Sequence, residues 1–459
     1  MKCSSVWKSA WRPFRTRSPS SRRSFIMNFD RMRALLLEQA VRGMLVSQRD
    51  DEPAVKQIGK VPDDVPFLIP EKWKWIAAQD AYELLSGRDL QKGEILDVES
   101  EAPSVPYITG ASQIIDSRVL ITRWTQNCSV KSVKGDLLLT CKGTVGKTAF
   151  NTVGDMHIAR QIMALRAKPE IVEGKFLRLF IDSIAETLAK NAKSMIPGID
   201  RKTLLKNSIP IPPLKEQRRI VAKLEESFAE IDRAEKAYRE LQTFAGVLRG
   251  KILQEAVMGK LVPQLDDEPA VEQIGEVPED VPFEIPEKWK WGVLSSIVPN
   301  VVDCPHSTPK YCDSETEYLA IDTNCIDDLG KITKWRYVTE EIYRARITRL
   351  TIQADDVIYT REGSIGRAAR VPADVKVCMG QRVMLIRPGE WIDSSFLQIY
   401  LMSKGTLSLL TEKQRGIGVK HINVSDVKKL PVPIPPLEEQ HRIVAKLEEL
   451  MKQVDALSA

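Results

Sequence analysis

The chain has 459 residues, too many for one ordinary hydrophobic core, and its composition of 43% hydrophobic and 28% charged residues is typical of a soluble globular protein. No apolar run reaches the roughly 20 residues needed to span a bilayer, which argues against a membrane protein. The formal net charge of +5 comes from the N-terminus: residues 1–26 carry seven Lys and Arg and no acid, which leaves 60 basic against 62 acidic residues elsewhere. Any nucleic-acid surface in the body of the protein must therefore arise by segregation of charge.

The N-terminal segment, residues 1–26, is rich in serine and arginine. This composition fits a transit peptide or a nucleic-acid-binding arm, and the segment lacks the apolar core of a secretory signal. The simpler expectation is a disordered leader, or translation that starts at Met27.

Cysteine usage indicates a reducing compartment. The seven cysteines are irregularly spaced and form no CxxC pair, so free thiols in the cytoplasm are expected. Cys304, His306 and Cys312 offer three candidate metal ligands, but their spacing is unusual for zinc, and we expect no metal site.

Two segments of the chain each occur twice. Residues 40–75 match residues 256–291 at 28 of 36 positions, and residues 209–226 match residues 432–449 at 15 of 18 positions. The sequences between these repeats differ strongly, so the layout alternates conserved spacers with variable domains. The predicted boundaries are a leader at 1–26, a conserved helical region at 27–69, a variable domain at 70–208, a central conserved region at 209–285, a second variable domain at 286–431 and a conserved helix at 432–459.

The central spacer is predicted to form a long helix that starts after Pro212 and Pro213. Its apolar residues recur at steps of three, four and seven, which is the pattern of a coiled-coil seam. The same pattern recurs in the C-terminal copy. Gly246 and Gly250 weaken the last turns and so allow a break near residue 246. The seam residues are Ile220, Leu224, Phe228, Ile231, Tyr238, Leu241, Ile443 and Leu447.

The two chain ends together correspond to one nearly complete spacer. Ala459 aligns with residue 236, whereas Met27 aligns with residue 243. We therefore expect two long antiparallel helices related by a pseudo-twofold axis, one of them built from both ends of the chain. Simple duplication with a truncated tail is the alternative.

Each variable domain is predicted to be α+β, because short Val, Ile and Leu runs alternate with Gly, Asp and Pro turns. Positive charge is concentrated in two windows, residues 117–149 and 342–388. Such windows indicate either a nucleic-acid surface or an ordinary solvated face.

The segment "CKGTVGKT" at residues 141–148 nearly matches a phosphate-binding loop. Cys141 stands where that loop requires glycine, and the internal repeat "TREGSIGRA" has Arg and Ala where Lys and Ser or Thr are needed. Nucleotide binding is therefore disfavoured. Basic residues on a glycine turn fit contact with a phosphate backbone or guanine better. The candidate DNA-binding residues here are Lys142, Thr144, Lys147, Arg361, Ser364 and Arg367.

A second glycine-punctuated basic loop precedes the C-terminal repeat, at residues 413–436. It contributes Arg415 and Lys420 as candidate DNA-binding residues, and its less basic counterpart in the first half contributes Lys193. A solvated hairpin that joins the domain to its helix is the alternative.

Catalytic signals are weak in this sequence. It contains only four histidines, no nucleophile elbow, no metal-ligand set and no acid pair repeated in both halves. We therefore expect no catalytic residues and no cofactor bound by this chain. A P-loop NTPase or nuclease that works alone, and a coiled-coil assembly protein without a DNA role, stay open as alternatives.

The two "PIPPLxEQxRIVAKLEE" segments, the "VPFxIPExWxW" domain entrances and the alternating layout resemble the specificity subunits of type I restriction–modification systems across about residues 27–459. The resemblance implies that each variable domain is a target-recognition domain that reads one half of a bipartite site in double-stranded DNA. It also implies that the paired helices set the spacing and dock two methyltransferase subunits, in the cytoplasm of a bacterium or archaeon. S-adenosylmethionine, ATP and magnesium would then belong to the methyltransferase and the restriction or translocase partners.

Overall fold

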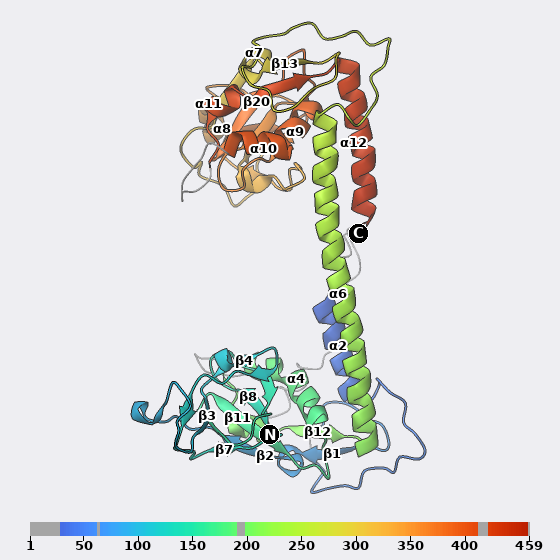
Figure 1. The fold of residues 1–459 in the computed structure, drawn as a ribbon, viewed down its shortest axis with the longest axis vertical. Coiled ribbons are helices and arrows are strands. Elements are labelled where there is room, and N and C mark those ends of the chain that lie inside the picture. Colours follow the sequence, from blue (N-terminus) through green and yellow to red (C-terminus); the bar gives the residue numbers. More distant parts are fainter. Residues whose placement is uncertain (1–27, 62–64, 191–197, 412–420, 458–459) are drawn as a thin grey trace. The chain divides into compact units, whose positions relative to one another are not determined.

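The computed structural model describes residues 28–61, 65–190, 198–411 and 421–457. The chain divides between Ala237 and Tyr238 into two compact units. Each unit contains a mixed domain of helices and sheets together with long helix segments (Figure 1). This confirms the predicted α+β class with two domains.

The first unit begins with a helix and ends in the long helix α6. Its elements are α2 (Phe29–Val41), β1 (Lys74–Ala77), α3 (Ala78–Ala81), β2 (Tyr82–Ser86), β3 (Val105–Ile108), β4 (Ile114–Ile115), β5 (Arg118–Val119), β6 (Trp124–Thr125), β7 (Lys131–Ser132), β8 (Leu137–Thr140), β9 (Thr148–Phe150), β10 (Met156–Ile158), β11 (Ile162–Ala167), α4 (Gly174–Lys190), α5 (Arg201–Leu205), β12 (Ser208–Ile211) and α6 (Leu214–Val257).

The second unit takes in the end of α6 and continues to the C-terminal helix. Its elements are β13 (Lys290–Val293), α7 (Leu294–Ile297), β14 (Asn300–Asp303), β15 (Tyr318–Ile321), β16 (Arg336–Tyr337), α8 (Glu340–Arg346), β17 (Val357–Thr360), β18 (Ala368–Arg370), β19 (Lys376–Met379), β20 (Val383–Arg387), α9 (Ser394–Met402), α10 (Lys404–Thr411), α11 (Val424–Lys428), β21 (Pro431–Ile434) and α12 (Leu437–Leu457). Short 3₁₀ turns lie at Lys92–Glu94, Ala111–Gln113 and Thr323–Cys325.

The two mixed domains share their main topology despite their different sequences, although the second sheet has four strands in the first domain and three in the second. An antiparallel sheet in the order β2-β11-β8-β9 corresponds to β14-β20-β17-β18 in the second unit. A second sheet contains the parallel pair β3 and β10, matched by β15 and β19. The short pairs β1–β12 and β13–β21 close the domains at their conserved borders. The fold was therefore duplicated along with the spacers.

The central strands are buried on both faces, which explains their continuous apolar sequence. Leu137 and Leu139 of β8 belong to the cluster that includes Phe176 of α4, whereas Leu138 belongs to a cluster with Ile158. The second unit divides β17 in the same way, with Tyr359 on the α9 side and Ile358 on the opposite face. Each domain thus has one core that reaches the helices and one that faces the second sheet.

Helix α6 is continuous over 44 residues, or about 66 Å at 1.5 Å per residue. The break that the two glycines allow near residue 246 does not occur. Buried Ala245 and Ile252 anchor the helix on either side of Gly246 and Gly250, and packing outweighs the low helix propensity of two glycines.

Short helices run alongside α6 within each unit (Figure 1). In the first unit, Arg33 of α2 forms ion pairs with Asp232 at 2.7 Å and Glu235 at 2.6 Å. In the second unit, Arg249 of α6 pairs with Asp455 of α12 at 2.6 Å. Arg249 and Asp455 occupy the repeat positions of Arg33 and Asp232, so each unit carries a copy of the same helix contact.

The helix ends that lead into the mixed domains are also duplicated. Gly43 follows α2 with φ +71°, and Gly259 follows α6 with φ +70°. A Cβ atom at these positions would lie 2.4 Å from Pro70 Cγ and 2.3 Å from Pro286 Cγ. Only glycine combines the left-handed conformation with this close approach.

Candidate nucleic-acid interface

The glycine loop of the first domain connects β8 to β9 in an antiparallel hairpin. The Thr140 hydroxyl accepts a hydrogen bond from the Lys147 backbone at 2.9 Å, and the Thr140 carbonyl accepts one from the Gly146 backbone at 2.9 Å. Gly143 and Gly146 have φ angles of +75° and +93°, which glycine adopts without strain. The loop backbone is therefore fixed from within.

The second domain builds the same loop between β17 and β18. The Thr360 hydroxyl accepts from the Arg367 backbone at 2.9 Å and donates to the Ser364 carbonyl at 2.6 Å. Gly363 and Gly366 again have positive φ angles, +73° and +81°. A threonine and two glycines at matching positions thus specify one loop geometry in both domains.

This geometry rules out a phosphate-binding P-loop at residues 141–148. A P-loop runs from a strand into a helix, whose N-terminal amides face the phosphates. Here the loop runs from β8 into β9. The segment at residues 141–148 is therefore not a P-loop.

The structure brings the two candidate basic segments of each domain together. Lys142 forms an antiparallel bridge with Gly198, and the Ile199 backbone donates to the Cys141 carbonyl at 2.9 Å. In the second domain Glu362 bridges to His421, and the Ile422 backbone donates to the Arg361 carbonyl at 2.8 Å. The candidates Lys193, Arg415 and Lys420 lie outside the described residues.

In the first domain the loop exposes its polar side chains. Lys142 and Thr144 are exposed. Lys147 is exposed as well, and its ammonium donates to the carbonyls of Ile114 at 3.2 Å and Ala111 at 3.4 Å. The loop therefore offers cationic groups that suit an anionic partner.

In the second domain the arginines of the loop are paired internally; Arg367 corresponds to Lys147, and Arg361 to Cys141. The side chain of Arg361 is only 12% exposed, and its Nη1 lies 2.6 Å and 2.5 Å from the two carboxylate oxygens of Asp303. Arg367 pairs with Asp328 at 2.6 Å and donates to the Ile326 carbonyl at 2.8 Å. Ser364 is half-buried. The same loop thus presents different chemistry in the two domains.

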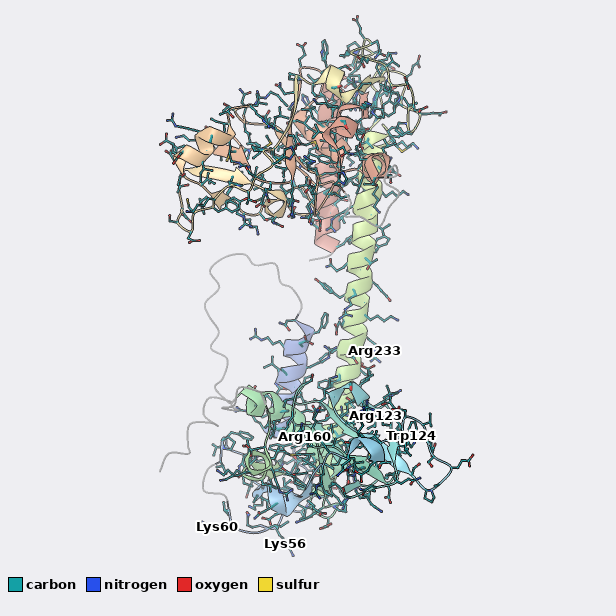
Figure 2. The ribbon with its side chains drawn as sticks, turned by 90° about the vertical axis from the view of Figure 1, so that its left-hand side faces the viewer. Lys56, Lys60, Arg123, Trp124, Arg160 and Arg233 are labelled. Carbon is teal, nitrogen blue, oxygen red and sulfur yellow. The ribbon has the colours of Figure 1, made fainter. Side chains whose placement is uncertain are left out.

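Sequence reasoning did not single out two exposed arginines of the first domain, which Figure 2 labels together with Trp124. Arg123 is exposed directly before β6, and Arg160 precedes β11 and pairs with Asp89 at 2.7 Å. Arg123 falls inside the basic window, and that window was the available signal. Arg160 lies outside it, and only the fold identifies it as exposed.

One histidine, His157, lies in the core of the first unit. His157 is fully buried, with Nδ1 accepting from the Val130 backbone at 3.2 Å and Nε2 lying 2.8 Å from the Arg88 carbonyl. Both ring nitrogens therefore have backbone hydrogen-bond partners. Within the described ranges no three His, Cys, Asp or Glu side chains converge as a metal site would require.

The repeated "EQxR" motif joins each mixed domain to its helix. Gln217 is fully buried; its carbonyl accepts from the Glu173 backbone at 2.7 Å, and its amide donates to the Ile171 and Pro212 carbonyls at 2.9 Å each. In the second unit the Gln440 carbonyl accepts from the Asp393 backbone at 2.8 Å. Its amide donates to Trp391 at 3.0 Å and to Pro435 at 2.9 Å.

The arginine of the motif holds the loop that enters the domain. Arg219 binds both oxygens of Glu52, at 3.0 Å and 2.7 Å, and Arg442 binds Glu268 with the same two distances. Each arginine also donates to a backbone carbonyl at 3.0 Å, that of Ser47 or of Pro263. Bidentate pairs of this kind fix orientation as well as distance.

The glutamate of the motif lies against the entrance tryptophan. The Trp73 indole donates to Glu216 Oε1 at 2.9 Å, and both side chains are buried. Trp289 and Glu439 are buried at the same positions of the second unit. Burial raises the pKa of Glu216 and of Glu439 above their ordinary value. The tryptophans are therefore packing anchors at the domain entrances.

The predicted seam residues differ in burial. Ile220, Leu224, Ile443 and Leu447 are buried, whereas Phe228, Ile231 and Tyr238 are half-buried. Leu241 is 38% exposed. It lies on α6 between the ion pairs that α2 and α12 make with that helix. Among the described residues, the seam side chains are therefore most buried at the ends of α6 and α12 that adjoin the mixed domains.

Two domains with matching glycine loops, each joined through the same motif to its own helix, α6 or α12, characterise a protein built by internal duplication. The family model for the type I restriction modification DNA specificity domain matches residues 70–242 and 321–458, which is more than half of the chain. The chain therefore belongs to this family of type I restriction–modification specificity subunits, whose role is recognition of DNA sequence.

Individual relatives support the assignment. The specificity subunit of the EcoAI enzyme of Escherichia coli is 25% identical over 98% of this chain and 94% of its own length. The EcoBI subunit of the same organism is 26% identical over 63% of this chain, and that match spans only 62% of the relative. The archaeal MjaVIII subunit of Methanocaldococcus jannaschii is 23% identical over 83% of this chain and 87% of its own length.

Solved structures share the fold. A chain from a structure that concerns complex assembly and conformational transition of the type I R-M system matches with a TM-score of 0.62 and 20% identity, covering 86% of this chain and 93% of that one. The HsdS subunit from Thermoanaerobacter tengcongensis matches with a TM-score of 0.54 and 21% identity, covering 85% and 92%.

Proposed function

We propose that each mixed domain reads one half of a bipartite, asymmetric DNA site, and that the helices set the gap between the half-sites. The observation that carries the proposal is the duplicated joint, in which Gln217 and Gln440 make equivalent hydrogen bonds in the two units. A rigid joint is useful when the orientation of a reader on its helix matters. Because the two domains differ in sequence, the half-sites should differ as well.

The proposed contacts divide by chemistry. Exposed Lys142, Thr144 and Arg123 suit the phosphate backbone and base edges of the first half-site. In the second domain, Arg361 and Arg367 already have carboxylate partners, so contact with a base would require exchange of those partners. The loop backbone and neighbouring groups of the second domain would then make more of the contacts that recognise its half-site.

The spacing function rests on the continuity of α6 across the boundary between the units. We propose that α2 and α12 support it as parts of two antiparallel coiled-coil rods in a pseudo-twofold arrangement. The conserved helical surfaces would dock two methyltransferase subunits, and restriction or translocase subunits would join them. In this proposal S-adenosylmethionine, ATP and magnesium are bound by those partners, and this chain is not itself catalytic.

The cellular setting follows from the same proposal. In the described part of the chain, no helix combines the length and the apolar character that a membrane span needs. A DNA-reading subunit of this family would work in the cytoplasm of a bacterium or archaeon.

An insertion tests the spacing role. Seven residues inserted after Ala237 would lengthen α6 by two turns, or about 10 Å, which equals roughly three base pairs at 3.4 Å each. Methylation by the reconstituted complex, measured on DNA with gaps varied one base pair at a time, should prefer the longer gap. The control carries the same insertion after Glu276, in an exposed loop, and should keep the original gap. An unchanged preference in the first variant would contradict the spacing role.

Exchange of one domain tests the reading role. Replacing residues 70–208 with the corresponding domain of a relative should change one half-site and leave the other intact. Loss of both half-sites in a folded complex would contradict independent readers.

A further inference from the structure

The second unit contains a cavity of about 800 Å³ between its reading domain and the helices α6 and α12. Cavities of roughly 300–1,000 Å³ are typical of small-molecule sites. Of the candidate DNA-binding residues that the structure describes in this unit, Arg361, Ser364 and Arg367, none lines the cavity, and Arg367 borders it through its ion pair with Asp328 of the lining. Its apolar wall includes Leu253 of α6, Ile399 and Met402 of α9, and Leu447 and Met451 of α12.

Two glycines of α6 shape the cavity. A Cβ atom on Gly246 would meet nothing within 4 Å, so the missing side chain leaves open space. The corresponding residue of the first unit is Asp30. At Gly250 a Cβ atom would lie 3.0 Å from Cε and 3.3 Å from Nζ of Lys404. Glycine therefore lets the Lys404 side chain lie directly against α6, at the edge of an apolar wall.

The charges around the cavity are only partly neutralised. Arg249 pairs with Asp455 at 2.6 Å, and Arg370 pairs with Asp355 at 3.3 Å. Lys331 and Lys404 also line the cavity, and in the described residues neither ammonium group has a carboxylate partner. Glu448 also lines the cavity, and its carboxylate has no basic partner among the described residues. The unneutralised charge is thus positive overall.

In the first unit an ion pair within the chain connects the domain to the helix at the position that corresponds to the cavity. There Lys175 of α4 pairs with Glu225 of α6 at 2.9 Å. Their repeat positions in the second unit are Ser395 and Glu448, both of which line the cavity. An ion pair across helix and domain has therefore been replaced by open space with unpaired lysines nearby.

We propose that this cavity binds an amphipathic organic anion, with an apolar ring system against α9 and α12 and a carboxylate, sulfonate or phosphate near Lys331 and Lys404. The apolar wall favours burial of the rings, and two unpaired ammonium groups favour the anionic group. The inference does not depend on the proposed DNA reading. An occupant would contact both the domain and its helices, and should stabilise the second unit against unfolding.

The probe is 8-anilinonaphthalene-1-sulfonate, added to the full-length chain and followed by its fluorescence. A molecule of this size should bind with a dissociation constant on the order of 10–100 µM. The uncharged analogue N-phenyl-1-naphthylamine should bind more weakly. No saturable binding of the sulfonate, or equally strong binding of the uncharged analogue, would overturn the proposal.

Two variants locate the site and the charge. Gly246→Leu fills the cavity and should weaken both probes at least tenfold, while helix propensity keeps the melting temperature at or above that of the wild type. Lys404→Met should weaken only the sulfonate, by several-fold. The matched control, Asp30→Leu, should bind both probes as the wild type does. Unchanged sulfonate binding in Gly246→Leu, or in Lys404→Met, contradicts the assigned site or the assigned ligand class respectively.

Discussion

The joint between the second reading domain and α12 can be broken with one substitution, Gln440→Ala. This change removes one acceptor and two donor contacts that link the helix to Asp393, Trp391 and Pro435. The side chain of Gln440, which makes these three hydrogen bonds, is fully buried. At about 1 kcal/mol net for each hydrogen bond, the free energy of unfolding should fall by about 3 kcal/mol. For a unit of this size that corresponds to a decrease of about 6–12 °C in melting temperature.

Calorimetry of the full-length chain measures the effect. The transition of the second unit should move to lower temperature, and that of the first unit should stay in place. The matched control is Gln453→Ala, an exposed glutamine on the same helix, which should change stability by less than about 0.5 kcal/mol.

The same variant also addresses function. In a complex reconstituted below the shifted melting temperature, Gln440→Ala should loosen discrimination of the gap between half-sites, and Gln440→Glu should restore only part of it because it keeps the acceptor alone. Melting identical to that of Gln453→Ala would refute the structural reasoning. Normal gap discrimination in a destabilised variant would confine the joint to a stability role.

Three further substitutions separate charge from packing. Lys142→Ala should leave stability unchanged and make the dependence of log K on log[salt] less steep by about one unit, as measured by binding titrations at several salt concentrations. Arg361→Ala should lower the free energy of unfolding by about 2 kcal/mol in urea titrations because Asp303 loses its partner, whereas loss of one half-site at unchanged stability would assign Arg361 to base contact. Glu439→Gln should gain stability relative to the wild type as pH rises. Burial raises the pKa of Glu439 in the folded protein above the usual 4.5, so the folded wild type binds more protons than the unfolded chain. The wild type therefore loses stability as the pH rises from 4.5 through the folded pKa, and the variant does not. A wild-type-minus-variant difference that is flat from pH 4 to 7 would contradict this assignment.

The sequence predicted the architecture to the extent that its repeats are visible. The offsets of the conserved segments located both helices and both mixed domains, because a duplicated sequence with one hydrophobic pattern folds in one way twice. The glycine loops at 141–148 and 361–368 were recognised for the same reason. The alternation of buried and exposed positions inside the variable domains was less informative, since strands such as β8 are buried on both faces.

The continuity of α6 through Gly246 shows the limit of helix propensity as a predictor. Glycine weakens a helix locally, but buried neighbours decide whether the helix continues, and those neighbours come from α9 and α12. Pairing is equally non-local: Arg361 and Asp303 are 58 positions apart. Charge counting therefore cannot distinguish an exposed cation such as Lys142 of the first loop from a neutralised arginine such as Arg361 of the second.

By itself the sequence determined the duplication, the helical spacers, the α+β class and the family, because these depend on patterns that are local or repeated. Only the tertiary structure decided which cations are exposed, how the "EQxR" motif joins each domain to its helix, and where a cavity opens beside Gly246. These features depend on side chains brought together across tens to hundreds of residues, and the free energy of each contact is set by burial that no single segment encodes.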